Sequence, residues 1–453
     1  MQESSSHILD GAILSWPWSL PFVGLLLSIA VGPILVPRIW SRHYGKIAAA
    51  WSALTVLAIA VVFGSATGLD ALMRAMLLDY MSFIALLFSL YVVAGGILVT
   101  GNLHGTPAGN TGMLLLGTAL ASLVGTTGAA MIMVRPLIQA NLHRRRNAHV
   151  LIFAIFLLAN VGGALTPVGN PPLFVGFLRG VDFPWPAQHL LGAVSLIVAM
   201  VLAIFAAIDF CYYRQEKNDV ASRHKAEPAV VRVRGLINIY LLGGLIAAIL
   251  LSAIWKPDIV ISIRGVDLEL RNLLRDAAIV AIAIASLKLT PAEHREANGF
   301  SWEPIREVAK LFAGIFVCII PMLAMLNAGP RGAFAWVAAL TSNGDIPNNL
   351  AYFWLSGLLS SFLDNAPTYL MFFELAGGDA HALMGPLAGT LAAISLGASC
   401  MGAMTYIGNA PNLMIYAIGV ERGIAMPSFF AFMAWSCTVL LPVFAIAGWV
   451  YFG

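Results

Sequence analysis

Apolar stretches about as long as a membrane span recur along the whole chain, and short polar segments separate them. An α-helix needs roughly 20 apolar residues to cross a bilayer. Runs of about that length, with one shorter run at 276–289, cover residues 13–36, 47–67, 81–99, 190–212, 236–254, 276–289, 308–326 and 429–451. The pattern predicts an all-α polytopic membrane protein.

Two other apolar stretches carry polar residues at their centres. Residues 111–140 have Gly125, Thr126 and Thr127 in the middle, which leaves two arms of about 14 residues, or about 21 Å each at 1.5 Å per residue. That is short of a hydrocarbon core of about 30 Å, so we expect a re-entrant hairpin. Residues 352–376, centred on Asp364, predict a second hairpin.

A duplication relates the two halves of the chain. The segment 163–172 (GALTPVGNPP) recurs 239 residues later as 402–411 (GAMTYIGNAP), and the hairpin centres 122–129 and 361–368 obey the same offset. Gly, Pro, Thr and Asn interrupt a helix here, so 150–177 and 387–418 are expected to be broken transmembrane helices. Matched breaks in two halves are typical of a transporter's binding site. The expected organisation is a first repeat at 1–212, a linker at 213–235 and a second repeat at 236–453.

Composition and charge agree with a multi-pass membrane protein. Hydrophobic residues make up 60% and charged residues 10% of the chain, whereas soluble domains have about 25% charged residues. Basic residues cluster after the first span, at Arg144–Arg146 and in the linker, and the positive-inside rule places all three groups in the cytoplasm. This requires a re-entrant first hairpin, an N-terminus outside and inverted repeats. A bacterial inner membrane is the expected location, and the net charge of +3 implies no nucleic-acid partner.

The breaks and hairpin tips hold the candidate site. Asp364 is the only acid in any of the four, and a carboxylate at membrane depth is costly enough to indicate a functional role. The alternative is a helix cap for the second arm, since Asp is a favoured N-cap. The remaining candidates offer neutral oxygens that suit Na⁺: Asn365, Thr368, Thr405, Asn409, Thr166, Asn170, Thr126 and Thr127. Asp364 and Asn409 are the expected sodium ligands.

Other polar residues are expected to be structural. Arg135 and Glu374, related by the same offset, should snorkel to the surface, Asp209 should be interfacial and His149 solvated. No Ser–His or HExxH constellation stands at a break, so an enzyme is not expected. No cofactor is expected beyond sodium as the coupling or transported ion.

The strings SSFLDNAPT (360–368), LTPVGNPP (165–172) and TYIGNAP (405–411) resemble the ion transporter superfamily. Within it they are similar to the NhaD-type sodium/proton antiporter and citrate-transporter-like group, over most of the chain from about residue 81. The resemblance implies a homodimer in which scaffold helices stay fixed while hairpins and broken helices move as an elevator. It also implies Na⁺ at the hairpin tips.

Two positions depart from the antiporter pattern. The antiporters carry an Asp-Asn pair at the first tip where this chain has Gly125 and Thr126, and they often have Gly-Asp-Pro where it has Gly169-Asn170-Pro171. A sodium/proton antiporter using Asp364 is the leading hypothesis. The alternative is a sodium-coupled importer of citrate or a similar anion, with the anion near Thr126, Thr127 and Asn170, and an oxyanion carrier is third.

Overall fold

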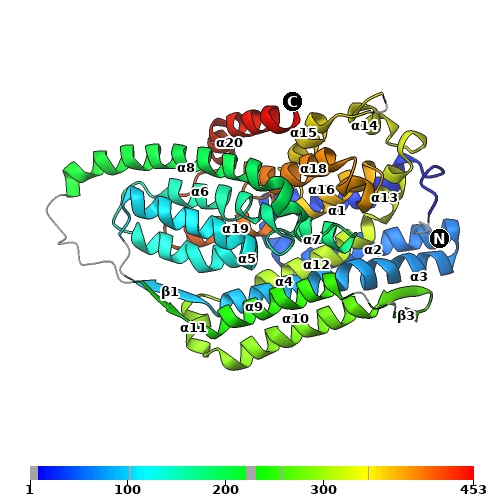
Figure 1. Cartoon of the computed structure of the whole chain (residues 1–453), viewed down its shortest axis with the longest axis horizontal. Coiled ribbons are helices and arrows are strands. Elements are labelled where there is room, and N and C mark those ends of the chain that lie inside the picture. Colours follow the sequence, from blue (N-terminus) through cyan, green and yellow to red (C-terminus); the bar gives the residue numbers. More distant parts are fainter. Residues whose placement is uncertain (1–8, 102–103, 221–230, 256, 258, 345) are drawn as a thin grey trace.

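The first half of the chain forms long helices joined by short connections (Figure 1). The computed structural model describes residues 9–101, 104–220, 231–255, 257, 259–344 and 346–453. Up to residue 220 the elements are the short helix η1 (Trp16–Ser19), α1 (Leu20–Leu35), α2 (Pro37–Phe63), α3 (Ser65–Arg74), the π-helix η2 (Ala75–Tyr80), α4 (Met81–Gly95), β1 (Leu98–Gly101), α5 (Pro107–Ala140), α6 (Ala148–Leu157), the 3₁₀ helix η3 (Val161–Leu165), α7 (Pro171–Leu178) and α8 (Trp185–Val220).

The second half has the same character. Its elements are β2 (Val231–Arg234), α9 (Ile237–Ile254), β3 (Val260–Ile263), β4 (Val266–Glu269), α10 (Leu270–Leu289), α11 (Ala292–Ala297), α12 (Glu303–Cys318), α13 (Ile320–Asn327), η4 (Gly329–Arg331), α14 (Ala335–Leu340), β5 (Ser342–Asn343), β6 (Ile346–Pro347), α15 (Asn349–Ser360), α16 (Asn365–Leu375), α17 (Ala380–Met384), α18 (Ala388–Cys400), η5 (Met401–Met404), α19 (Ala410–Glu421) and α20 (Phe429–Phe452).

Eight helices within the described residues are long and apolar enough to cross a membrane. The count rises to nine if α12 and α13, which meet at a bend of 44°, form one span. The expectation of a polytopic, mainly helical membrane protein is therefore confirmed.

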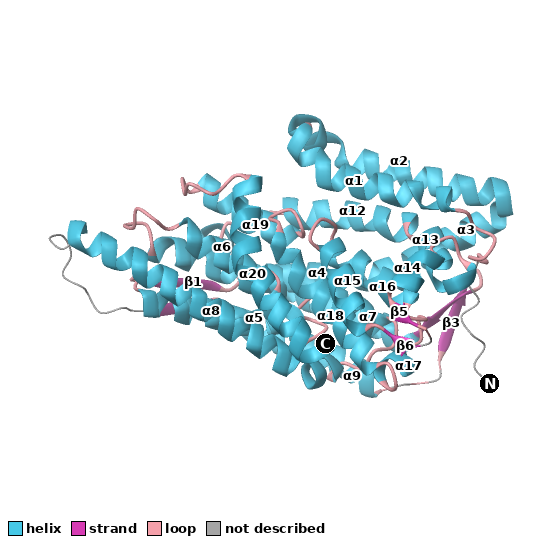
Figure 2. Ribbon diagram, turned by 90° about the horizontal axis from the view of Figure 1, so that it is seen from above, coloured by secondary structure: helices cyan, strands magenta, loops and turns pink. Residues whose placement is uncertain are grey.

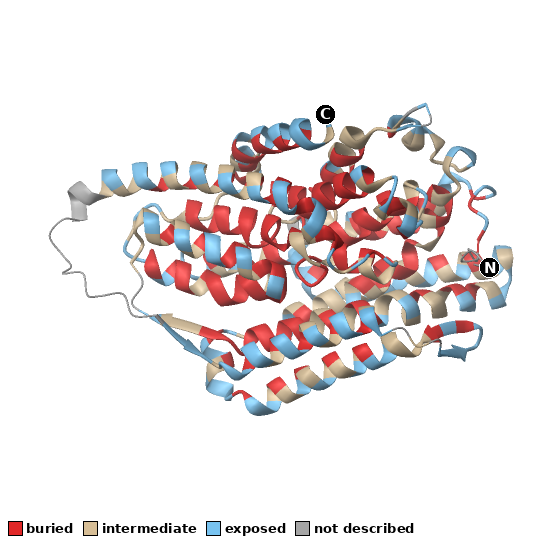
Figure 3. Cartoon of the chain, in the orientation of Figure 1, coloured by how far each residue is buried: buried red, intermediate tan, exposed pale blue. Residues whose placement is uncertain are grey.

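The helices divide into a central group and an outer group. The span that joins α6 to η3 has 89% of its residues buried, whereas the corresponding window of α2 has 17%. Outside, α2 packs against α12 and α10 packs against α4 and α9. Figure 3 shows buried positions concentrated in the central helices, with exposed and buried positions alternating along the outer ones.

Both expected hairpins fold back on themselves. A straight helix of the 34 residues of α5 would be about 51 Å long. Yet Asn110 near its start and Asn141 just after its end exchange two hydrogen bonds of 2.9 and 2.8 Å, so α5 consists of two antiparallel arms. In the second hairpin the rings of Tyr352 on α15 and Phe372 on α16 lie 6.3 Å apart, so these arms are antiparallel as well.

Three two-stranded ribbons were not expected from the sequence. The β1–β2 ribbon lies at one end of the molecule, and the β3–β4 and β5–β6 ribbons lie at the other (Figure 2). Strand β2 comes from the 213–235 linker, and α8 continues into that linker as far as Val220; residues 221–230 lie outside the described part. The backbone N–H of Arg146 donates to Glu216 at 2.9 Å, so the Arg144–Arg146 loop lies beside the end of α8 that leads into the linker.

Candidate functional site: two matched breaks and two hairpin tips

The backbone leaves the helix in the same way at both breaks. Thr166 and Thr405 are extended, with φ/ψ of −143°/154° and −131°/155°, and so are Asn170 and Asn409, with −140°/134° and −157°/166°. In the first break a proline follows both residues, and the residue before proline is disfavoured in the helical region. The second break reaches the same conformation without those two prolines, because the Asn412 amide donates to the carbonyls of Gly402 at 2.8 Å and Thr405 at 2.9 Å.

Glycines keep each break compact. A side chain on Gly169 would collide with the carbonyl of Gly163, and one on Gly408 would collide with the carbonyl of Gly402. The two pairs are equivalent under the 239-residue offset, so the same tight fold of the backbone occurs twice.

Each break is tied to the hairpin of its own half by equivalent hydrogen bonds. The Thr166 hydroxyl donates to the carbonyl of Ser122 at 2.5 Å, and the Thr405 hydroxyl donates to that of Ser361 at 2.6 Å. In return, Ser122 donates to the Gly162 carbonyl and Ser361 to the Met401 carbonyl, again 239 residues apart. The two threonines therefore hold the breaks against the hairpin tips.

At the second tip, Asp364 is the N-cap residue that precedes α16. Its carboxylate accepts the Ala366 N–H at 3.2 Å, and its own carbonyl accepts the Thr368 hydroxyl at 3.0 Å. The side chain is half-buried and has no ion-pair partner within the described residues. Asp364 thus caps the helix, as the alternative hypothesis predicted. The remaining lone pairs of its carboxylate are available for a cation.

Asn365 is buried next to it. Its Oδ1 accepts the Ser360 hydroxyl at 2.7 Å, while its Nδ2 has no hydrogen-bond partner among the residues described. Such an unpaired buried polar group calls for an explanation such as a ligand or a water molecule.

At the first tip, Gly125 reverses the chain with φ/ψ of 79°/156°, a conformation essentially restricted to glycine. Thr126 is buried, and its N–H donates to the Gly169 carbonyl at 3.0 Å, joining this tip to the first break. Thr126 and Thr127 line a cavity of about 60 Å³ that lies between the tip, the first break, α19 and the outer helices α4 and α12. No carboxylate lines this cavity among the described residues.

Asn160 joins the two breaks, although it was not among the site residues predicted from the sequence. Its Oδ1 accepts the Asn409 amide at 2.7 Å, and its Nδ2 donates to Asn412 at 2.8 Å. Asn170 makes the reciprocal but longer contact, at 3.5 Å, with the carbonyl of Ser399, the counterpart of Asn160. The signal was present, because Asn160 is the only strongly polar residue between Val150 and Leu165.

The candidates do not form a single cluster. Thr166, Thr126 and Asn170 gather at the first break, and Thr405 and Asn365 gather around the second hairpin, while Asn409 reaches across to Asn160. No hydrogen bond joins Asp364 to Asn409 in the described structure, and the Asn409 oxygen already accepts the Asn412 N–H at 3.0 Å. Sodium binding by Asp364 and Asn409 stays a prediction.

Three polar residues predicted near the ends of spans are buried in ion pairs. Asp209 is fully buried at the base of the first hairpin, where it contacts Arg144 and His149, the latter at 2.8 Å. Glu374 is buried at the base of the second hairpin and pairs with Arg179 at 3.1 Å. The expectations of a solvated His149 and a snorkelling Glu374 were wrong, because each has a buried partner that the sequence could not place. The interfacial position of Asp209 stays a prediction.

The interrupted helices, paired hairpins and apolar spans define a polytopic membrane protein with a duplicated polar centre. A family described as putative citrate transport matches residues 11–452, and the chain belongs to this family. It is 24% identical over 352 residues to an uncharacterized transporter of Mycobacterium bovis and, to the same extent, to one of Mycobacterium tuberculosis; each match covers 76% of both chains. A 46 kDa membrane protein of Mycobacterium leprae is 22% identical over 355 residues, which is 76% of this chain and 77% of that protein.

These comparisons support a membrane transporter that resembles the citrate-transport group, and they fit the expectation that the chain is not an enzyme.

Proposed function

We propose that this chain is a sodium-coupled secondary transporter of a small carboxylate such as citrate. The observation that carries the proposal is the pair of matched breaks, each held to a hairpin tip by an equivalent threonine hydrogen bond. At such breaks the N-termini of half-helices present N–H groups that favour an anion, and unwound carbonyls favour a small cation. The family description supports citrate as the first substrate to test.

The two tips differ in charge, and on this basis we assign cation binding to one tip and anion binding to the other. The cation is assigned to the second half, where Asp364 supplies a carboxylate and Asn365, Thr368, Thr405 and Asn409 supply neutral groups. The anion is assigned to the neutral first tip, near Thr126, Thr127 and Asn170, because a carboxylate substrate there meets no like charge.

Sodium/proton antiport is the second candidate. Asp364 favours it, since a half-buried carboxylate without an ion-pair partner in the described residues can exchange Na⁺ for H⁺. The sequence alone places antiport first. The neutral first tip and the family description support carboxylate transport, and we therefore propose it ahead of antiport.

An elevator-type mechanism is part of the proposal. The Asn160–Asn409 contact joins both broken helices, so we expect the hairpins and broken helices to move as one body against the outer helices. We also propose a homodimer, formed by outer helices, in the inner membrane of a bacterium.

Flux in proteoliposomes tests the transported species. With Na⁺, pH and citrate gradients varied separately, carboxylate transport requires that citrate stimulate Na⁺ uptake and that Na⁺ stimulate citrate uptake. Na⁺ flux that depends on a pH gradient and ignores citrate would establish antiport instead.

Inverted repeats with an external N-terminus follow from the positive-inside rule. Single cysteines at Asn147 and at Ser222, which lies outside the described residues, should both be protected from an impermeant reagent in intact cells. Arg146 and Glu216 are in contact, which supports placing the loop and the linker on the same side. Labelling of either cysteine from outside would reject this topology.

A further inference from the structure

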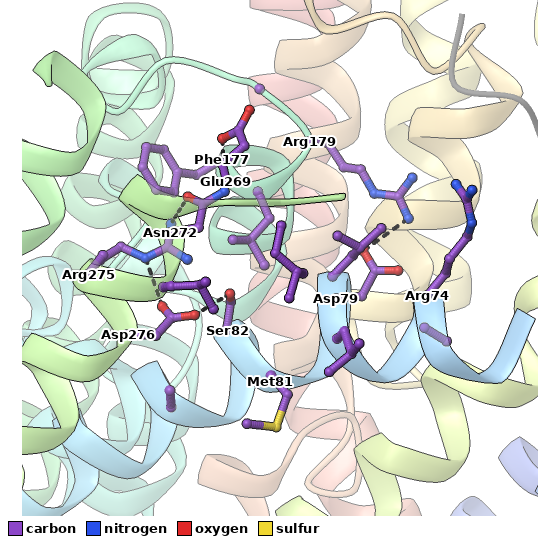
Figure 4. A pocket seen from close by; sticks show the side chains of 18 of the residues that line it. Arg74, Asp79, Met81, Ser82, Phe177, Arg179, Glu269, Asn272, Arg275 and Asp276 are labelled. Carbon is purple, nitrogen blue, oxygen red and sulfur yellow. Dashed lines mark hydrogen bonds and ion pairs between the residues drawn. The ribbon is translucent and has the colours of Figure 1, made fainter. Parts of the chain in front are cut away.

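A cavity of about 920 Å³ lies between α4, α7 and α10, next to β4 and the base of the second hairpin (Figure 4). We call it the outer cavity, because residues of the outer helices α4 and α10 line it. None of the described residues of the two breaks and tips lines it. Its volume falls in the range of roughly 300–1,000 Å³ that is usual for small-molecule sites.

Arg275 in the wall of this cavity has an unused hydrogen-bond donor. The residue is only 3% exposed; its Nε donates to Asp276 at 2.9 Å and its Nη1 to Asn272 at 3.1 Å. The rings of Phe174 and Phe177 on α7, each 5.9 Å from the guanidinium carbon, flank it. Nη2 has no hydrogen-bond partner among the described residues. A buried charged donor left unpaired is costly, so this position is suited to an acceptor supplied by a ligand.

A second guanidinium faces the same cavity. Arg179, which follows α7, pairs with Glu374 at 3.1 Å and with Asp79 at 3.4 Å, while its Nε is buried without a partner in the described structure. Figure 4 shows Arg275 and Arg179 on opposite sides of the cavity. Two donors on facing walls favour a ligand that has acceptors at both ends.

The charge balance inside the cavity permits an anion. Ten charged residues line it: Arg74, Arg179, Arg271, Arg275, Asp79, Asp182, Asp267, Glu269, Asp276 and Glu374. Asp182 and Asp267 are exposed, whereas the other four acids are half-buried or buried and equal the arginines in number. The buried and half-buried part of the lining is therefore neutral, and the two additional acids face solvent, where water weakens their repulsion of an anion.

We propose that the outer cavity binds a small di- or tricarboxylate, with one carboxylate accepting a hydrogen bond from Nη2 of Arg275 and another facing Arg179. Arginine suits this role because its planar fork matches a carboxylate. The inference rests on the proposed function for its ligand class. It adds a capture site that is separate from the site at the breaks.

Protection of an introduced cysteine from chemical labelling can measure ligand binding in the outer cavity. Leu78 lines the outer cavity and is exposed, so Leu78→Cys can be labelled with an impermeant maleimide after the accessible Cys211 and Cys437 are changed to serine. The protein is reconstituted in nanodiscs of phosphatidylcholine. At a citrate concentration about ten times its Kd, labelling should slow about tenfold. Acetate, which has one carboxylate, should protect much less.

Two arginines of α10, Arg275 and Arg271, provide a test variant and its matched control. Arg275→Gln should raise the citrate concentration for half-protection roughly 10- to 100-fold, the loss expected for a charge-assisted hydrogen bond. Arg271→Gln should leave it nearly unchanged, because Arg271 also lines the cavity but is already paired with Glu269. If Arg275→Gln fails to fold, Arg275→Lys, which keeps the charge but loses the fork, should still weaken protection.

The outcomes separate the capture site from the transport proposal. Citrate flux without citrate protection of Leu78→Cys would overturn the capture site and leave the transport proposal intact. Protection lost in Arg275→Gln, with no citrate flux, would establish the site and reject the transport proposal. Protection by phosphatidylglycerol nanodiscs alone, with no effect of citrate in phosphatidylcholine, would assign the cavity to a lipid phosphate and overturn the inference.

Discussion

The two hairpins have the same scaffold and different tips. In the first, Gly125 turns the chain in a glycine-only conformation and no acid is present; in the second, Asp364 stands at the equivalent position with an ordinary φ of −56° and caps the following helix. The threonine hydrogen bonds beneath the two tips are equivalent. The two halves therefore share the contacts that hold the tips, and they differ in the residue at the tip itself, which is glycine in the first and aspartate in the second.

The bases of the hairpins differ in the same way. The first is held by Asp209 with Arg144 and His149, and the second by Glu374 with Arg179. Neither Asp209 nor Glu374 has an acidic counterpart 239 residues away, since those positions are Gly448 and Arg135. Buried ion pairs are weak contributors to stability once desolvation is counted, but removing one partner is costly. We infer that each base was fixed independently after the duplication.

Replacing Asp364, the acid that distinguishes the second tip from the first, should have the largest effect on transport. Asp364→Asn keeps the size and the cap, since Asn caps helices about as well as Asp. We expect sodium-coupled transport to fall roughly 100-fold, as on loss of a metal-site group, with little change in thermal stability in detergent. Flux and melting temperature, measured on the same preparation, check this. Wild-type flux would show that the carboxylate only caps α16.

The asparagines at the breaks should give a smaller and unequal effect. Asn409→Leu removes the contact with Asn160 and the cap of the Asn412 N–H, so we expect a loss of about 2–4 kcal/mol in the free energy of unfolding, from two unpaired buried groups. Asn170→Leu, the matched control, loses one contact of 3.5 Å and should cost about 1 kcal/mol. Chemical unfolding in micelles gives both values. Equal losses would mean that Asn160 does not join the halves.

The sequence predicted the breaks and hairpins because both depend on local signals. Thr-Pro and Asn-Pro disfavour helix, and a central Gly125 or Asp364 divides an apolar stretch, so their positions can be deduced without knowing any tertiary contact. Each local pattern also occurs in both halves of the chain, which strengthened the prediction. The antiparallel arms of α5 confirm the fold-back at Gly125.

The partners of buried polar residues could not be predicted in this way. His149 meets Asp209 across 60 residues and Asn160 meets Asn409 across 249 residues, and nothing local distinguishes a buried ion pair from two surface charges. Asn160 also has a serine as its counterpart, so a search for identical residues in the two halves passes over it.

Changing Gly125 tests the backbone difference between the tips. Gly125→Ala forces a side chain into a conformation that costs about 1–3 kcal/mol. Asp364→Ala, at the equivalent position, loses only a cap, worth about 1 kcal/mol. Gly125→Ala should therefore lower the free energy of unfolding more than Asp364→Ala does. Asp364→Ala should in turn reduce the rate of transport more than Gly125→Ala does. The reverse ranking in stability would mean that the first tip adapts its backbone freely.

The smallest expected effect tests what the tips share. Thr166→Val and Thr405→Val each remove one hydroxyl donor while keeping the shape of the side chain, and the carbonyls of Ser122 and Ser361 each lose one hydrogen bond. Each change should cost about 1 kcal/mol. Thr166→Val should cost somewhat more, because the Thr166 hydroxyl also accepts the Gly169 N–H at 3.0 Å, a contact without a counterpart at Thr405 in the described structure. The double variant should then show the sum in chemical unfolding. A double variant that departs from the sum by more than about 0.5 kcal/mol would mean that the two breaks are energetically coupled through the Asn160–Asn409 contact.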